Sequence, residues 1–181
     1  MSPDREILRA ELESQLEFER LLTETSVRFV NLPPEQVESE IQDALKRICE
    51  SLHFDRSSMW QMSEPAQSDA PLTHMYQAQD QVIPPLPSRL ATRESFPWTM
   101  ENVLKGKIIT ISNLSDLPPE AEQDRSSYLF FKTKSTVIIP LMAGGVYLGH
   151  MAFATLRQER DWPEALVKRL QIVAQVFANA I

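Results

Sequence analysis

Cysteine is almost missing from this sequence, and long apolar runs are missing altogether. Cys49 is the single cysteine, so the chain can form no internal disulfide and lacks the several thiolates of a Cys-only zinc site. No stretch approaches the roughly 18 apolar residues that predict a membrane-spanning helix. The first residues are polar, and no apolar segment of a secretory signal follows them. These absences favour a soluble chain in a reducing cytoplasm.

Positive charge is also scarce. The chain carries 18 Lys and Arg against 25 Asp and Glu, a formal net charge of −7. Because nucleic acids are bound mainly by cationic side chains that neutralise phosphates, this balance disfavours direct DNA or RNA binding. It equally disfavours a polybasic contact with a membrane surface. The histidines, His53, His74 and His150, show no metal-ligand spacing, so no metal site is expected.

What is present suits a single globular domain with helical extensions. Of the 181 residues, 43% are hydrophobic and 24% are charged, which is enough apolar material for a core. Apolar residues recur at helical spacing over residues 5–30 and again from Val37 to about His53. Pro33 and Pro34 separate these two predicted helices, because proline cannot continue the helical hydrogen-bond ladder.

The middle and end of the chain favour antiparallel strands. Short half-apolar runs at 57–62 and 72–78 predict a hairpin. Two stronger strands, 135–142 and 147–156, flank paired glycines, which supply the positive φ of a tight turn. Strands joined by hairpins pair antiparallel, so an α+β fold is predicted rather than a doubly wound parallel sheet. The other predicted elements are a loop at 79–95, short helices at 97–105 and 120–131, a strand at 107–112 and a last helix from 164 onward.

The last helix carries a pattern of its own. Asp161 is predicted to cap it by accepting amide hydrogens in Asp161-Trp162-Pro163-Glu164. The last helix is apolar on two sides, so it needs two partners to bury them, its own sheet and another helix. The chain ends at Ile181 without a polar tail, which favours a helix that continues into an output module; the alternative is a terminal helix packed once on the core. The predicted coiled-coil seam for dimerisation and relay is Leu166, Leu170, Val173 and Phe177.

The closing hairpin and the order of the elements resemble a GAF domain. The hairpin runs Ser135-Thr-Val-Ile-Ile-Pro140-Leu-Met-Ala-Gly-Gly145-Val-Tyr-Leu-Gly149-His-Met-Ala-Phe. The family pattern is Ser, an apolar run, Pro-Leu, a Gly-containing turn and an apolar-Gly-apolar strand. Residues 28–33 and 160–180 resemble a bacterial subgroup that precedes PAS and histidine-kinase modules or occurs in transcription activators. The resemblance covers nearly the whole chain.

The resemblance implies a central antiparallel sheet of five to six strands. The long N- and C-terminal helices and the second helix would pack on one face, and the short helices and loops would cover a ligand pocket on the other. It divides the chain into an N-terminal signalling or dimerisation helix, residues 1–30, and a GAF domain, residues 31–181. Family members bind cyclic nucleotides, bilins, haem or small metabolites, and some bind nothing known.

Several specialised versions of the family are disfavoured. Bilin attachment needs a cysteine near the pocket, whereas Cys49 falls on the inner stripe of a predicted helix. The methionine sulfoxide reductase version needs more than one cysteine. The Asn-Lys…Phe…Asp-Glu pattern associated with cyclic-nucleotide binding is absent. Haem is disfavoured because a lone strand histidine is more often structural than a ligand. No cofactor is therefore expected, and an unknown small-molecule ligand remains open.

The candidate ligand-binding residues are aromatic side chains and one histidine. They would form an aromatic wall, with the histidine donating or accepting a hydrogen bond. The alternative is that they are ordinary core residues, since aromatic side chains dominate cores in any case. The candidates are Trp60, His74 and Tyr76 on the first two strands, Phe96 and Trp98 near the first short helix, and Tyr128 in the second.

These patterns predict a cytoplasmic sensory input domain of a bacterial signal-transduction protein, such as a two-component system. It would bind a small molecule and relay its state through the terminal helices to a kinase or transcription-activator output in the same polypeptide. The alternative is a ligand-free dimerisation and relay domain of the same fold. A homodimer is expected. The domain shows no nucleophile motif or acid/base pair, so it is not expected to be an enzyme, although the full-length protein can carry a kinase or ATPase module.

Overall fold

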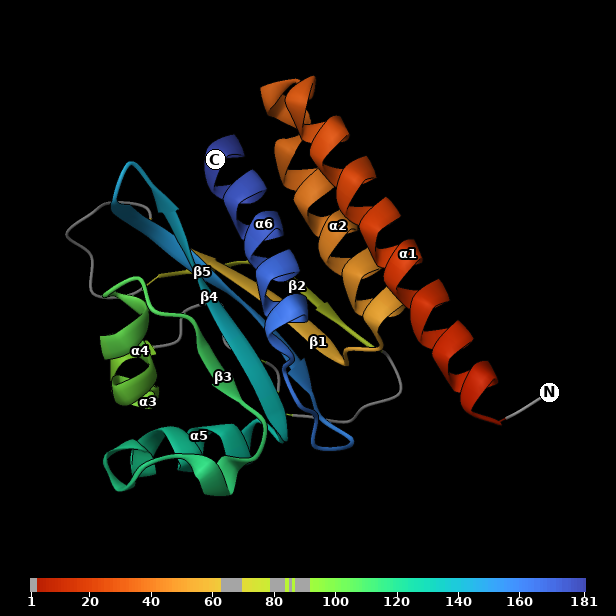
Figure 1. Ribbon diagram of the computed structural model, residues 1–181. Coiled ribbons are helices and arrows are strands. Elements are labelled where there is room, and N and C mark those ends of the chain that lie inside the picture. Colours follow the sequence, from red (N-terminus) through yellow and green to blue (C-terminus); the bar gives the residue numbers. More distant parts are fainter. Residues whose placement is uncertain (1–2, 63–69, 79–83, 85, 87–91) are drawn as a thin grey trace.

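One sheet divides the molecule into two layers of helices (Figure 1). The computed structural model describes residues 3–62, 70–78, 84, 86 and 92–181. Within them, a five-stranded sheet has the order β2-β1-β5-β4-β3, and every neighbouring pair is antiparallel. This confirms the predicted α+β architecture. The strands are β1 (Arg56–Gln61), β2 (Leu72–Gln77), β3 (Ile109–Ile111), β4 (Ser135–Ala143) and β5 (Val146–Thr155).

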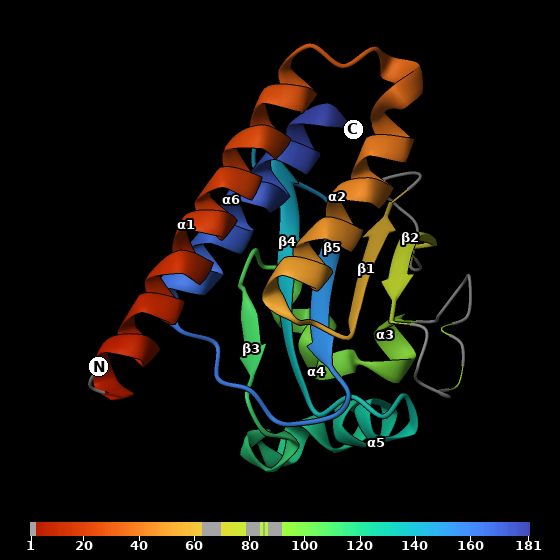
Figure 2. The same ribbon diagram turned by 90° about the vertical axis from the view of Figure 1, so that its right-hand side faces the viewer.

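Three long helices cover one face of the sheet: α1 (Pro3–Val30), α2 (Val37–Leu52) and α6 (Glu164–Ala180). A short 3₁₀ turn, η1 (Pro34–Gln36), leads into α2. Helices α2 and α6 lie next to the sheet, and α1 lies over both of them, as the two views in Figures 1 and 2 show. The main core lies in this layer and joins helix residues such as Ile48 and Phe177 to strand residues such as Met151.

The opposite face is covered by short elements: α3 (Thr92–Ser95), α4 (Pro97–Val103), η2 (Leu114–Asp116), η3 (Pro119–Ala121) and α5 (Glu122–Phe130). A second, smaller core joins them to β3 and β4 through Val103, Tyr128 and Ile138. This layer agrees with the prediction, with one correction. The segment expected to be a loop up to residue 95 ends in α3, and most of its earlier residues lie outside the described part of the chain.

The hairpin between β4 and β5 confirms the predicted tight turn at the paired glycines. Gly144 and Gly145 have φ values of 57° and 79°, which suit the tight turn that joins twisted antiparallel strands. Gly149, farther along β5, serves a different purpose. A Cβ there would lie 2.0 Å from the backbone oxygen of Trp60 on β1, so only glycine allows the two strands to approach this closely.

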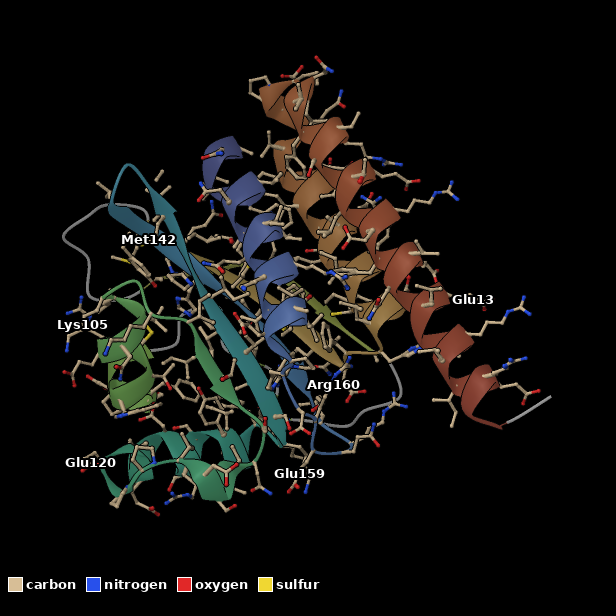
Figure 3. The ribbon with its side chains drawn as sticks, in the orientation of Figure 1. Glu13, Lys105, Glu120, Met142, Glu159 and Arg160 are labelled. Atoms are coloured by element: carbon tan, nitrogen blue, oxygen red, sulfur yellow. The ribbon has the colours of Figure 1, made fainter. Side chains whose placement is uncertain are left out.

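The start of α6 differs from the predicted cap. Pro163 occupies the N-cap position, and no side chain accepts a hydrogen bond there. Asp161 therefore lies two residues before the N-cap. Trp162 anchors the segment instead, because its Nε1 donates to the Ile111 carbonyl at 3.2 Å. Arg160 lies below α6 (Figure 3). Its guanidinium donates to the Leu52 carbonyl at 2.6 Å and so ties this connection to the end of α2.

No helix among the described residues has the length and apolar character needed to cross a bilayer.

Candidate functional site

A cavity of about 70 Å³ lies between the sheet and the α4–α5 layer. Its floor comes from β1, β5 and β4, and its roof comes from α4, α5 and the segments that flank them. The described lining residues are Arg56, Ser58, Trp60, Leu86, Phe96, Thr99, Met100, Tyr128, Phe131, Thr133, Thr136, Ile138, His150, Ala152 and Ala154.

Strand alternation builds the floor in three rows, because every second residue of a strand points to the same face. Arg56 pairs with Ala154 of β5, which in turn pairs with Thr136 of β4. The next row is Ser58, Ala152 and Ile138, and the third begins with Trp60 and His150. Polarity is therefore graded along the cavity, with a cation at one end and stacked rings at the other.

Arg56 supplies the charge at the polar end. Its side chain is buried, with 6% of the residue exposed. Nη2 donates to Oγ1 of Thr133 at 2.8 Å, and Nη1 donates to the Phe131 carbonyl at 3.4 Å. Burial lowers the pKa of Arg56 to about 10, because a low-dielectric surrounding disfavours the charged form. The guanidinium nevertheless stays protonated at neutral pH.

His150 and Trp60 form the opposite end. Their rings stack with centroids 6.1 Å apart, and His150 Nδ1 shares a 2.6 Å hydrogen bond with the Tyr147 hydroxyl. Burial lowers the pKa of His150 to about 4. The imidazole is therefore neutral at physiological pH and offers the cavity hydrogen-bonding capacity without charge.

Asp124 holds the two covering helices together. This carboxylate on α5 is completely buried and accepts hydrogen bonds from the backbone amides of Trp98, at 3.1 Å, and Thr99, at 2.8 Å. These amides belong to the first turn of α4, where they have no partner inside the helix. A carboxylate of one helix thus caps the other. The hydroxyl groups of Thr99 and Tyr128 add a 3.0 Å hydrogen bond between the same helices.

Three of the six predicted ligand-binding residues meet at this cavity: Trp60, Phe96 and Tyr128. Phe96 and Tyr128 contact each other in the roof, with ring centroids 4.7 Å apart. Trp98 is only partly buried and packs against the second core, and it is not among the described lining residues. Its backbone amide, rather than its indole ring, makes the connection to Asp124.

The grouping of His74 and Tyr76 with Trp60 is wrong. His74 lies directly opposite Met59, and directly opposed residues of an antiparallel pair share a face. Trp60 follows Met59 and therefore points the other way. His74 Nε2 lies 3.1 Å from the Glu38 carbonyl of α2, and Tyr76 packs against the main core. Both residues belong to the helix-covered side of the sheet.

Sequence reasoning missed Arg56 and His150. One signal was available: Arg56, Ser58 and Trp60 alternate along β1, so an arginine shares the face of a predicted pocket tryptophan. The contribution of His150 depends on its register with Trp60, which the hairpin alone does not give.

The residues predicted to form the dimer and relay seam pack in or against the core of the domain. Leu170, Val173 and Phe177 are at most 1% exposed and belong to the main core, and Leu166 packs against it. The seam is therefore covered by this chain's own elements, with the sheet on one side and α1 on the other. On the α1 side, the ring centroids of Phe29 and Phe177 are 5.3 Å apart. A second copy of the chain cannot reach these core residues while the domain is folded in this way.

Cys49 also lies on the helix-covered side. It is completely buried in the main core, and burial raises the pKa of its thiol to about 12. Among the described residues, no group of three or more His, Cys, Asp or Glu side chains is arranged to hold a metal ion.

Comparisons with known proteins agree with this architecture. The sequence model of the GAF domain matches residues 36–181. The phycocyanobilin-bound GAF domain of a cyanobacterial phytochrome superposes with a TM-score of 0.74 at 16% identity, covering 90% of this chain and 92% of that one. The GAF domain of a phosphoenolpyruvate-protein phosphotransferase from Coxiella burnetii gives 0.66 at 16% identity, with coverages of 91% and 92%.

An enzyme with the same fold is also similar. Free methionine-R-sulfoxide reductase from Neisseria meningitidis, solved with its substrate, gives a TM-score of 0.68 at 10% identity and covers 93% of this chain and 89% of that one. A comparison with curated protein sequences returned no match. At these identities the solved structures establish the fold alone, whereas the sequence model spans most of the chain. The chain belongs to the GAF domain family.

Proposed function

We propose that this chain is a sensory input domain of a bacterial signal-transduction protein. It binds a small molecule in the cavity between the sheet and the α4–α5 layer and passes the bound state to an output module through its terminal helices. One observation carries the proposal. A cavity with a graded lining, from Arg56 to the Trp60–His150 stack, lies at the face of the sheet that the long helices leave free.

The route of the signal follows the packing of β5, α6 and α1. Ala152 and His150 line the cavity, while their neighbours Met151 and Phe153 point into the main core, which also contains Phe177 of α6. A ligand that shifts the cavity-lining residues of β5 thereby also shifts the β5 residues that pack in the core with the helices. Such a ligand shifts the helices only by the difference between its affinities for the two arrangements.

We also propose that the domain works as a homodimer, with a second copy of the chain on the outer face of α1. This face, rather than the buried seam of α6, carries exposed apolar residues that fall within about 100° of the helix circumference. Ion pairs such as Arg9–Glu13, at 2.8 Å, lie beside it, and Glu13 points outward in Figure 3. An identical copy is the simplest partner, because a two-fold axis pairs one apolar face with itself. The exposed apolar residues of this face are Leu8, Leu12, Leu16, Val27 and Val30, whereas the exposed Ile7 lies outside it.

The second candidate function is a ligand-free relay domain of the same fold. The small size of the cavity favours it, since about 70 Å³ is roughly half the volume of an engineered protein cavity that binds benzene. The contacts of Phe96 with Tyr128 and Phe131 already occupy much of the roof. The two functions differ in a measurable way, because only the first requires a ligand. Neither includes catalysis or a cofactor.

Thermal unfolding in the presence of a metabolite panel tests the proposal. Ala152→Leu fills the centre of the floor, and Ala10→Leu makes the same change at an exposed position of α1. We expect at least one metabolite to raise the Tm of the wild type and of Ala10→Leu by mass action, but not that of Ala152→Leu. If no metabolite stabilises the wild type at saturating concentration, the relay domain is the correct account.

A further inference from the structure

Arg56 is the one charged side chain among the described residues that line the cavity. Its described partners, the Thr133 hydroxyl and the Phe131 carbonyl, are both neutral, and no carboxylate of the described residues forms an ion pair with it. Buried charges in proteins are ordinarily paired, because an unpaired one loses its hydration without compensation. The guanidinium therefore faces the cavity without a described counter-ion.

We propose that the ligand of this cavity is a small monocarboxylate whose carboxylate group pairs with Arg56. This rests on the proposed sensory function and names the class of molecule that is sensed. A guanidinium has more N–H donors than its two described bonds use, and its planar fork matches the geometry of a carboxylate. The ligand supplies the counter-ion that the described protein residues do not.

Two hydroxyl groups beside Arg56 suit the same anion. Thr133 Oγ1 accepts from Arg56, and Ser58 Oγ accepts from the Trp60 indole at 3.2 Å. In these bonds both hydroxyl groups act as acceptors, so their own protons are available to a ligand oxygen. The Thr136 hydroxyl, by contrast, donates to the Phe153 carbonyl at 2.9 Å. The polar end thus combines one cation with two hydroxyl donors.

The rest of the cavity limits the ligand to one negative charge and a short tail. His150 is neutral at physiological pH, so a dianion such as phosphate would leave its second charge buried and unpaired. Beside Ser58 the floor is apolar at Ala152 and Ile138, and the rings of Trp60 and Phe96 also line the cavity. A volume of about 70 Å³, roughly half that of the benzene-binding cavity, restricts the ligand to a short tail.

Calorimetric titration with propionate, propionamide and inorganic phosphate, at constant ionic strength, tests this assignment. Propionamide has nearly the shape of propionate but no charge, and phosphate is an anion without a tail. We expect propionate to bind the wild type at least about tenfold more tightly than either control, because charge-assisted hydrogen bonds are the stronger ones. Equal binding of propionate and propionamide, or tighter binding of phosphate, overturns the assignment.

Two variants keep the test specific. Arg56→Met removes the charge at similar length and should weaken propionate binding at least about tenfold, whereas Arg56→Lys keeps a cation and should retain part of it. Circular dichroism verifies that both variants fold. Retention of full propionate binding by Arg56→Met contradicts the assignment even if propionate binds the wild type. If an uncharged metabolite stabilises the wild type but not Ala152→Leu, and propionate does not bind, the sensory function stands and only the carboxylate class falls.

Discussion

Burial gives the ring of His150 a different protonation behaviour from that of an exposed histidine. Its neighbours are the Tyr147 hydroxyl, the Trp60 ring and the remaining lining of the cavity. Burial lowers its pKa in the folded protein to about 4, below the value of about 6.5 expected in the unfolded chain. Between these values the unfolded chain binds the proton and the folded protein does not. The stability linked to His150 is therefore fully present above pH 6.5 and is lost as the pH falls towards 4.

We predict that the free energy of unfolding depends on pH through His150 and that this contribution is absent from His150→Phe. For the wild type, the free energy of unfolding should fall by up to about 1.4 kcal/mol per pH unit within this window because of His150 alone. Acidic residues titrate in the same range, so the difference between wild type and variant isolates the histidine. Urea denaturation at several pH values between 4 and 7 measures it. Parallel pH profiles for the two proteins would contradict the prediction.

At the scale of elements, the α4–α5 connection determines how firmly the cavity is covered. The Asp124 carboxylate accepts hydrogen bonds from two backbone amides of another helix. The carboxylate is completely buried, so the two amides depend on it for their hydrogen bonds. This bridge was not predictable from the sequence, because local capping rules relate a side chain to its own helix rather than to one 25 residues away.

We predict that Asp124→Ala destabilises the protein by about 1–3 kcal/mol, since it leaves buried amides without acceptors. Asp116→Ala is the matched control; Asp116 is exposed in η2, and its replacement should change stability by less than about 0.5 kcal/mol. Urea denaturation gives both values. Hydrogen exchange should become faster in α4 of Asp124→Ala, and equal stability of the two variants would show that the bridge contributes nothing.

Most elements were predictable because they depend on local chemistry. Gly144 and Gly145 marked the β4–β5 turn, and Pro33 and Pro34 marked the break after α1. The site was only half predictable, because it depends on which strand residues share a face. His74 and Tyr76 were misplaced by the register of β2, and Asp161 by a two-residue shift at the start of α6. Neither register nor shift has a local sequence signal.

At the scale of the whole molecule, α1 has two different sides. Phe18 and Leu22 are buried against the domain, whereas Leu12 and Leu16 are more than half exposed. Helices α1 and α6 are tied by the Arg169–Glu19 ion pair at 2.8 Å. In Figures 1 and 2 they run in the same direction, so that α6 ends beside the α1–α2 connection. In a dimer formed through α1, the α6 helix of each copy would thus be tied to the dimer interface through α1.

We predict that the chain is a dimer at tens of micromolar and that Leu12→Glu combined with Leu16→Glu makes it monomeric. Charges on the paired apolar faces would be desolvated and would repel each other, while the fold tolerates them because both positions are exposed. Val146→Glu introduces one glutamate at the exposed β4–β5 hairpin and should remain dimeric. Sedimentation equilibrium distinguishes the states. A monomeric wild type would remove the dimer from the account.

Native mass spectrometry tests the ligand site most directly. The wild type and Ala152→Leu are each incubated with the same pool of small metabolites, desalted and weighed intact. A cavity that serves as a binding site predicts an added mass of one small molecule per chain on the wild type and none on the filled variant. The same added mass on both proteins, or none on either, would contradict the account.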